Sequence, residues 1–409
     1  MLLLDNFRIV DEVSDFFGSL VIENGMIKEV LDRRAKLLNG ASYIDGGGLV
    51  LMPAFVDLHA HFREPGALEK ESLASGSLAA AAGGFGTVVC MANTSPVTDT
   101  VEKAAALKRR GDAVGLIDLY PALSLSRAMD GKELSQITQK DAARYTRLFS
   151  EDGKDIKDDD LFLAAFKAAR RAGKGSGIPV SCHCDLDGED HATERALRLG
   201  KKAAAHVHLA HVSTARAVSM IRRAKQEGGS VSCEATPHHL SLTGSDAHML
   251  GAETFGKVAP PLRSEADRQA LAAAVADGTV DAIATDHAPH TQDDKARGAP
   301  GFSGLETAFA VCYTTLVKPA ADGISLSKLS SLLGGAPARI LGFGGAGPQG
   351  RGRIARRYRA DLCVVDPNVR WTVNTSLFKS NGKNSPFEGR ALYGKVVMTL
   401  HRGRVVFQE

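Results

Sequence analysis

The sequence predicts an α/β protein made of a (β/α)₈ barrel and a small β-sandwich domain to which both termini contribute. Short apolar segments alternate with alanine-rich helical segments from about residue 53 to about 340, the pattern of βα units around a parallel sheet. The first and last fifty residues instead hold short apolar runs separated by turn residues. We therefore expect a barrel domain over residues 53–344 and a small β domain over residues 1–52 and 345–409.

Both ends of the chain carry hairpin signals. Asn24 and Gly25 separate two apolar segments within "SLVIENGMIKEV", and this dipeptide favours a tight β-turn. Near the C-terminus, Arg402 and Gly403 interrupt "GKVVMTLHRGRVVF" in the same way. We expect the terminal segments to form small antiparallel hairpins that pair as one β unit, with the glycine-rich stretch 342–353 as a loop leading back to it.

The middle of the chain contains eight strand candidates. Eight βα units suggest a closed barrel, and the active site of such a barrel lies at the C-terminal ends of the strands. Polar residues that follow the strands are therefore candidate site residues. The strand candidates are "AFVDLH", "GTVVC", "GLIDLY", "YTRLF", "IPVSCH", "VHLAH", "VSCEA" and "VDAIAT".

Composition limits the kind of partner. The 409 residues are 44% hydrophobic, enough for one large domain and a smaller one. The 50 Lys and Arg nearly balance the 47 Asp and Glu, so charge gives no reason to expect nucleic acid or an anionic membrane as a partner. Six scattered cysteines without a CxxC pair suit reduced thiols, and no signal peptide or membrane span is predicted. We expect a soluble, cytoplasmic protein with a small-molecule ligand.

Polar side chains follow five of the eight predicted strands. The first strand ends in a His-Ala-His sequence, and the two-residue period of a strand directs both imidazoles to one side, where they can share a metal. The candidates, in strand order, are His59 and His61, Glu151 and Asp152, His183, His211, and Asp286, His287 and His290.

One such residue alone carries little information. A single HxH sequence is usually a chance event or a surface pair. Packing or hydrogen bonding explains His206, His208, His238 and His239 more simply than metal binding, and Asp152 by itself would suit a turn or helix cap. The convergence is informative, because four histidines and two aspartates occur at the one face of a barrel where they could meet. This pattern indicates a two-metal site.

The residue types suggest the chemistry. Neutral imidazole and carboxylate suit Zn²⁺ or a similar divalent ion, and a carboxylate between two ions can bridge them. Two ions can activate a water molecule and polarise a carbonyl group, as hydrolysis of an amide-like bond requires. A carboxylate after strand eight can carry the proton from that water to the leaving nitrogen, and Asp286 is the candidate for this role.

Ten segments together carry a resemblance to a known family: "MPAFVDLHAHFREPG", "MANTSPVTD", "FSEDG", "SCHCD", "HLAHVST", "EATPHHL", "APPLR", "IATDHAPHT", "GFSGLETAF" and "SPFEGRALYGKV". With them the chain resembles the amidohydrolase superfamily and, within it, the type I dihydroorotases, over nearly its whole length. The resemblance implies reversible interconversion of (S)-dihydroorotate and N-carbamoyl-L-aspartate, the ring-closing step of pyrimidine synthesis.

The resemblance also implies a role for each candidate residue and two Zn²⁺ ions per chain. The implied metal ligands are His59 and His61 for one ion, His183 and His211 for the other, Asp152 as the bridge, and Asp286, which is also the acid/base. The implied contacts to the substrate carboxylate are Arg63, Asn93 and His290. A guanidinium suits this task because it can grip a carboxylate with two parallel hydrogen bonds.

Three departures from the family pattern bear on substrate binding. Ala259 stands where the family usually has asparagine, and Ala92 stands where it usually has proline. The segment between His183 and His211 is shorter than the family's usual excursion over the active-site face. We expect these departures to leave metal binding intact and to raise the KM for dihydroorotate, which a partner that covers the open face could improve.

Two other functions compete with this interpretation. Hydantoinases and allantoinases generally bridge their metals with a carboxylated lysine, and here Asp152 takes that place although Lys154 is close. Some dihydroorotase-like chains only support an aspartate carbamoyltransferase, but such chains tend to lose metal ligands, and all six candidates are present here. A homodimer and a carbamoyltransferase complex are the macromolecular partnerships that the resemblance leaves open.

Overall fold

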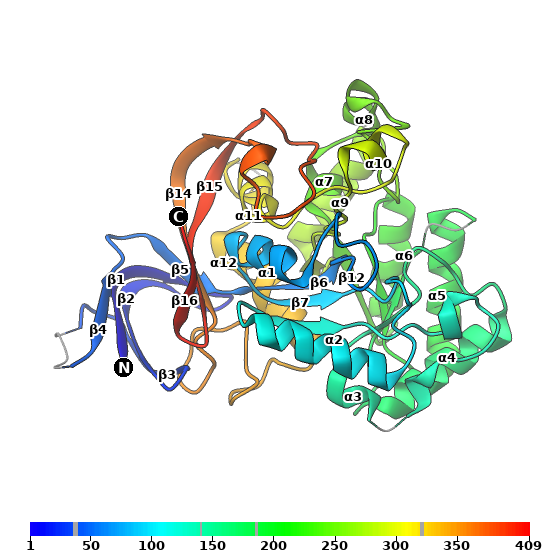
Figure 1. Ribbon diagram of the computed structural model, residues 1–409, viewed down its shortest axis with the longest axis horizontal. Coiled ribbons are helices and arrows are strands. Elements are labelled where there is room, and N and C mark those ends of the chain that lie inside the picture. Colours follow the sequence, from blue (N-terminus) through cyan, green and yellow to red (C-terminus); the bar gives the residue numbers. More distant parts are fainter. Residues whose placement is uncertain (36–39, 140, 185–186, 320–322) are drawn as a thin grey trace.

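The computed structural model describes residues 1–35, 40–139, 141–184, 187–319 and 323–409. Figure 1 shows two regions, a set of strands that holds both chain termini and a barrel covered by helices. Within the described residues, no helix is both long and apolar enough to cross a membrane.

Eight parallel strands form the barrel. Parallel pairing links β6 to β8 and β9 to β13, and parallel bridges between Leu123 and Phe149 and between Ala60 and His287 close the circle. Each predicted strand segment overlaps one of these strands, so the predicted barrel is confirmed. The strands are β6 (Phe55–Ala60), β7 (Phe85–Cys90), β8 (Asp118–Pro121), β9 (Phe149–Ser150), β10 (Val180–Cys182), β11 (Val207–Leu209), β12 (Val231–Ala235) and β13 (Ala282–Ile283).

Several barrel strands are shorter than their apolar segments. The segment "YTRLF" is the clearest case, because its first residue, Tyr145, ends the short helix α3 (Ala142–Tyr145) and only Phe149 joins the sheet. Apolar runs mark buried backbone but do not fix where pairing begins, so strand ends are the least predictable feature of such segments.

Helices cover the outside of the barrel. Most of the long ones begin at a Ser, Thr or Asp whose side chain accepts a backbone N–H of the first turn, as at Thr100 and Thr214. The longer helices are α1 (Leu73–Ala82), α2 (Val101–Val114), α4 (Asp159–Ala172), α5 (Glu189–Ala203), α6 (Ala215–Gln226) and α9 (Glu265–Asp277). The shorter ones are α7 (Pro237–Ser241), α8 (Gly244–Leu250), α10 (Gln292–Ala296), α11 (Ala308–Cys312), α12 (Leu326–Ser330) and α13 (Ala336–Ile340). Short 3₁₀ and π segments are η1 (Arg127–Met129), η2 (Gln136–Thr138), η3 (Tyr313–Val317), η4 (Ser331–Gly335) and η5 (Thr375–Leu377).

Strands from both ends of the chain form one further sheet. Its order is β16-β15-β14-β5-β1-β2-β3, with β4 also paired to β1. The prediction that the termini pair as one β unit is confirmed, and the expected antiparallel hairpins are present. The sheet is mixed rather than antiparallel throughout, because β4 and β5 lie parallel to β1. The strands are β1 (Leu2–Val10), β2 (Asp15–Glu23), β3 (Met26–Leu31), β4 (Ser42–Asp45), β5 (Val50–Pro53), β14 (Leu362–Thr372), β15 (Ala391–His401) and β16 (Arg404–Gln408).

Both predicted hairpin turns are present. Asn24 and Gly25 join β2 to β3 with φ of 51° and 75°, and Arg402 and Gly403 join β15 to β16 with φ of 50° and 72°. Positive φ at both central residues matches the twist of two-residue hairpins. Asn and Gly tolerate a positive φ, which explains why the turn at Asn24 and Gly25 could be predicted from the sequence.

A buried ion cluster joins this sheet to the barrel. Asp118, at the start of β8, contacts the guanidinium groups of Arg351, Arg359 and Arg402. Burial alone would raise the pKa of the Asp118 carboxyl, but Arg351 and Arg359 outweigh burial and hold it far below its usual value. The carboxylate thus compensates cationic groups that come from the C-terminal segment.

We expect Asp118→Asn to destabilise the fold by about 3–5 kcal/mol, because removing one partner of a buried ion pair leaves uncompensated charge. Chemical denaturation measures this difference. The control is Asp15→Asn, which removes an exposed ion pair with Arg8 and is expected to cost less than about 1 kcal/mol. Equal losses in the two variants would contradict the role assigned to the cluster.

Candidate active site

A cavity of ≈ 180 Å³ opens at the C-terminal ends of the barrel strands. Eight of the nine residues to which the resemblance assigns a role line it, and the ninth, His59, contacts two of them. The structure therefore brings all nine together. The lining residues are His61, Arg63, Asn93, Asp152, Gly153, His183, His211, Ala259, Asp286, Ala288, His290, Pro300 and Gly301.

His59 lies at the centre of the charged groups. Its Nε2 is 3.0 Å from Asp152 Oδ1 and 3.6 Å from Asp286 Oδ1, and its ring is 1% exposed. Burial alone would lower the pKa of His59, but the surrounding carboxylates outweigh burial and raise it well above its usual value. The two aspartates thus create a strong preference for positive charge at this place.

The two aspartates also approach His61, whose Nε2 is 3.5 Å from Asp152 Oδ2 and 3.3 Å from Asp286 Oδ1. Asn93 supports this arrangement, because its Oδ1 lies 3.0 Å from His61 Nδ1 and its Nδ2 donates to Asp152 Oδ2. Asn93 therefore orients two predicted metal ligands in addition to facing the cavity where a substrate would lie.

Two further imidazoles have nitrogen atoms available for a ligand. The rings of His183 and His211 lie 4.5 Å apart at their centroids. His183 Nδ1 and His211 Nε2 are buried and have no hydrogen-bond partner in the described part of the chain. Burial, reinforced by His183 and His59, lowers the pKa of His211 to about 3, so its imidazole is neutral at physiological pH. A neutral, unpartnered imidazole is the form that binds a metal ion.

These donors fit divalent metal ions. Ligand atoms of His59, His61 and Asp286 lie within 4.8 Å of one another, and so do those of His59, Asp152 and His211. Burial alone would raise the pKa of Asp152, but His59, His61 and His183 outweigh it and keep the carboxyl well below its usual value. Burial alone would likewise raise the pKa of Asp286, but His61, His59 and His211 outweigh burial and lower it. Ionised carboxylates beside imidazole nitrogens form a nitrogen and oxygen donor set of the kind that Zn²⁺ prefers.

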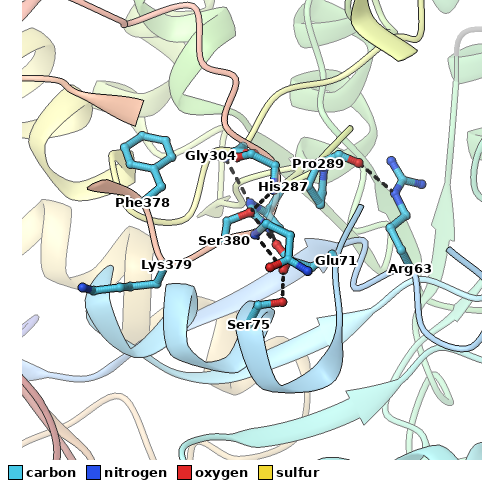
Figure 2. Close-up of polar contacts among 12 residues, drawn as sticks. Arg63, Glu71, Ser75, His287, Pro289, Gly304, Phe378, Lys379 and Ser380 are labelled. Carbon is cyan, nitrogen blue, oxygen red and sulfur yellow. Dashed lines mark hydrogen bonds and ion pairs between the residues drawn. The ribbon is translucent and has the colours of Figure 1, made fainter. Parts of the chain in front are cut away.

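Arg63 and His290 lie on another side of the cavity. Arg63 Nε donates to the Pro289 carbonyl (3.3 Å), as Figure 2 shows, and its Nη2 lies 3.3 Å from His290 Nε2. Burial, with Arg63 alongside, lowers the pKa of His290 to about 3. A fixed cation next to a neutral imidazole forms a pocket for an anionic group.

A buried lysine holds two segments of the cavity wall. The Lys295 ammonium, which is fully buried, donates to the carbonyls of Lys257, Ala299 and Gly301 at 2.9–3.0 Å. These carbonyls flank Ala259 and Pro300, which face the cavity. All three N–H groups of the ammonium are thereby satisfied, so the charge can remain buried.

Sequence reasoning missed Glu234, the next-to-last residue of β12. Its Oε1 is 3.2 Å from His59 Nδ1, and its Oε2 is 2.9 Å from His208 Nε2. His208 serves in hydrogen bonding rather than at the cavity, and so do His206 and His239. A signal was present, because a lone acid inside an apolar buried strand requires a partner.

Lys154 and Glu151 do not reach the cavity. Lys154 is exposed, and Glu151 accepts hydrogen bonds from the backbone of Leu125 and Ser126. Helix α5 begins at Glu189, soon after His183 in the sequence, and Asp185 and Leu186 lie outside the described residues. Thus Asp152 is the strand-four side chain that faces the candidate metal ligands.

Comparison with known proteins agrees with this geometry. The sequence profile described as the amidohydrolase family matches residues 50–406. A protein named dihydroorotase from Clostridium botulinum (strain Eklund 17B / Type B) is 37% identical over 413 residues, covering 100% of both chains. Another dihydroorotase, from Anaeromyxobacter dehalogenans (strain 2CP-1 / ATCC BAA-258), is 38% identical over 440 residues, covering 100% of this chain and 98% of the relative.

Solved structures share the fold at lower identity. L-hydantoinase (dihydropyrimidinase) from Arthrobacter aurescens superposes with a TM-score of 0.88 at 24% identity, covering 100% of this chain and 96% of that one. Dihydropyrimidinase from Brevibacillus agri NCHU1002 gives a TM-score of 0.87 at 22% identity, with 100% and 95% coverage. These similarities establish the barrel and terminal β architecture.

We expect Glu234→Gln to weaken Zn²⁺ binding by roughly 10–100-fold, because an amide offers one acceptor where the carboxylate serves two histidines. Competition with a chelator measures the affinity. Glu227→Gln, which alters exposed ion pairs only, is the control and should bind as the parent does. Unchanged Zn²⁺ affinity in Glu234→Gln would show that His59 does not depend on this contact.

Proposed function

The chain belongs to the amidohydrolase family, and on this premise we propose that it is a metal-dependent dihydroorotase, which interconverts (S)-dihydroorotate and N-carbamoyl-L-aspartate in pyrimidine biosynthesis. The relatives named dihydroorotase support this function at 37–38% identity over the whole chain. The observation that carries the proposal is the meeting of Arg63 with two ionised aspartates and four imidazoles at one cavity. That combination suits an anionic cyclic amide better than a neutral one.

We propose that the site holds two Zn²⁺ ions. His59 and His61 would bind one, His183 and His211 the other, with Asp152 between the two and Asp286 as a further ligand. The unpartnered nitrogens of His183 and His211 support this assignment. When bound, such ions activate water and polarise the amide carbonyl.

The protein's own side chains would supply the remaining steps. Arg63, Asn93 and His290 would hold the substrate carboxylate and so fix the ring in the cavity. Asp286 would accept the proton of the attacking water and deliver it to the ring nitrogen as the amide bond breaks. The low pKa of its carboxyl keeps Asp286 ionised, which is the form that can act as a base.

Two alternatives fit the site less well. A hydantoinase-like metal bridge through a carboxylated lysine lacks support, because Lys154 is exposed and does not line the cavity. A non-catalytic scaffold has no need of the full ligand set, yet all six candidate ligands lie at or beside this cavity. A catalytic role therefore accounts for more of the structure.

We further propose a cytoplasmic location, which the six free, buried cysteines support. A partner could cover the open face, and a second copy of the chain or an aspartate carbamoyltransferase is the proposed occupant. The C. botulinum relative aligns with this chain over 413 residues and 100% of both chains, so it has no long insertion relative to this chain, including between His183 and His211. Sedimentation of the chain, alone and with a carbamoyltransferase, tests both partnerships.

We expect Asp286→Asn to lower kcat for dihydroorotate by roughly 10²–10⁴-fold, the usual contribution of a proton carrier, while most of the bound metal remains. Steady-state kinetics and metal analysis of the same preparation measure both effects. Asp293→Asn, at an exposed position of α10, serves as the control. Turnover in Asp286→Asn equal to that of the parent would rule out the assigned role.

Changing Arg63 to Lys should raise the KM for dihydroorotate roughly tenfold or more, because a point charge cannot reproduce a two-bond grip, and a hydrogen bond to a charged group contributes about 1.5–3 kcal/mol. Initial rates over a range of dihydroorotate concentrations measure the KM. The matched change Arg8→Lys affects an exposed arginine that also binds a carboxylate with two hydrogen bonds, and it should leave KM unchanged. The substrate assignment is wrong if both variants behave as the parent.

A further inference from the structure

The backbone at Asp286 adopts a strained conformation. Its φ is +46°, in the left-handed region that non-glycine residues rarely occupy. Such conformations cost about 1–3 kcal/mol and persist only where the surroundings fix them. Here the conformation directs the carboxylate to within 3.3 Å of His61 Nε2. The groups that hold the neighbouring residues therefore determine where the proposed proton carrier points.

Asp57 fixes the residue before Asp286. The backbone N–H and the hydroxyl of Thr285 both donate to the Asp57 carboxylate, at 3.0 and 2.5 Å. Asp57 belongs to β6 and is fully buried, so the strand that carries His59 also anchors the start of the strand-eight loop. This anchor is rigid because both carboxylate oxygens are engaged.

Glu71 fixes the residue after Asp286. His287 Nε2 donates to Glu71 Oε2 (3.0 Å), and His287 Nδ1 accepts from the Gly304 N–H (3.2 Å), as Figure 2 shows. Each ring nitrogen thus has one partner, and the imidazole is held in one orientation. The His287 carbonyl in turn accepts from the His61 backbone N–H (2.8 Å).

Glu71 is itself held by other parts of the chain. The hydroxyl of Ser75, in α1, donates to Oε1, and the hydroxyl of Ser380 donates to Oε2 (2.5 Å). The Asn381 N–H also donates to Oε1 (3.2 Å). Burial alone would raise the pKa of the Glu71 carboxyl, but the contacts with His287, Ser380 and Ser75 outweigh it and lower the pKa. Four donors around one buried carboxylate make a rigid junction.

We propose that Glu71 is a positioning residue for Asp286, which it holds in the strained, active orientation through His287. Glu71 does not line the cavity, so it acts on the reaction only through its neighbours. Ser380 and Asn381 extend this support to the segment between β14 and β15, so the C-terminal part of the chain helps to aim a group inside the barrel. The inference rests on the proposed function, in which Asp286 carries the proton.

The test compares kinetics, metal content and structure in matched variants. In Glu71→Gln, one oxygen that accepts two donors becomes an amide nitrogen, so we expect kcat to fall at least tenfold, with KM and bound Zn²⁺ within twofold of the parent. His287→Gln keeps an N–H donor near Glu71 and should retain more activity than His287→Leu. The control is Asp5→Asn, which alters a buried, multiply hydrogen-bonded carboxylate in the terminal sheet and should lower stability without lowering kcat.

Non-additivity provides a second criterion. If Glu71 and His287 act as a unit, the kcat of the double variant Glu71→Gln/His287→Leu is no lower than that of His287→Leu alone.

A kcat of Glu71→Gln within twofold of the parent would overturn the proposal. If Glu71→Gln does not fold, the two His287 variants decide, and equal activity in both overturns it. If the parent itself turns over neither dihydroorotate nor hydantoin, the proposed function is wrong. A crystal structure of Glu71→Gln then tests separately whether Glu71 positions Asp286. An unchanged φ at Asp286 with its His61 contact intact would then contradict the proposal.

Discussion

Two buried carboxylates that face the same imidazoles are the constraint on which the rest of the site depends. Asp152 and Asp286 both approach His59 and His61 within 3.0–3.6 Å, in a cavity where like charges repel strongly. Such an arrangement is stable only when positive charge lies between the acids. The imidazoles, Arg63 and the proposed metal ions meet this need, and Glu234 and Asn93 fix the rings that do so.

The same constraint explains where backbone strain occurs. Arg63, His211 and Asp286 each follow a barrel strand, and each has a positive φ, of 53°, 33° and 46°. Strand ends that continued in a regular extended conformation would direct side chains alternately in and out of the barrel. The left-handed residues turn these side chains toward the cavity instead, at a free-energy cost that buried hydrogen bonds nearby offset. The bonds from Thr285 to Asp57 and from His287 to Glu71 do this for Asp286.

Much of this structure follows from the sequence, for identifiable reasons. Strand periodicity and the C-terminal location of barrel active sites predicted that four histidines and two aspartates meet at one face, whereas Arg63 and Asn93 were identified only through the family resemblance. Glu234 and Asp57 were missed although each stands alone in an apolar strand, a pattern that requires a buried partner. Glu71 carried no local signal, because its role depends on Ser380, 309 residues away in the chain. The parallel pairing of β4 and β5 with β1 was unpredictable for the same reason, since hairpin signals report only on adjacent strands.

The central claim is that this cavity binds an anionic cyclic amide and opens it. The most direct measurement compares kcat/KM of the Zn²⁺-loaded parent chain for dihydroorotate and for hydantoin, which lacks the carboxylate. The account predicts a preference for dihydroorotate of about 100-fold or more, because binding without the carboxylate leaves the Arg63 charge unpaired. Equal or greater efficiency with hydantoin, or no activity in fully metal-loaded protein, would contradict it.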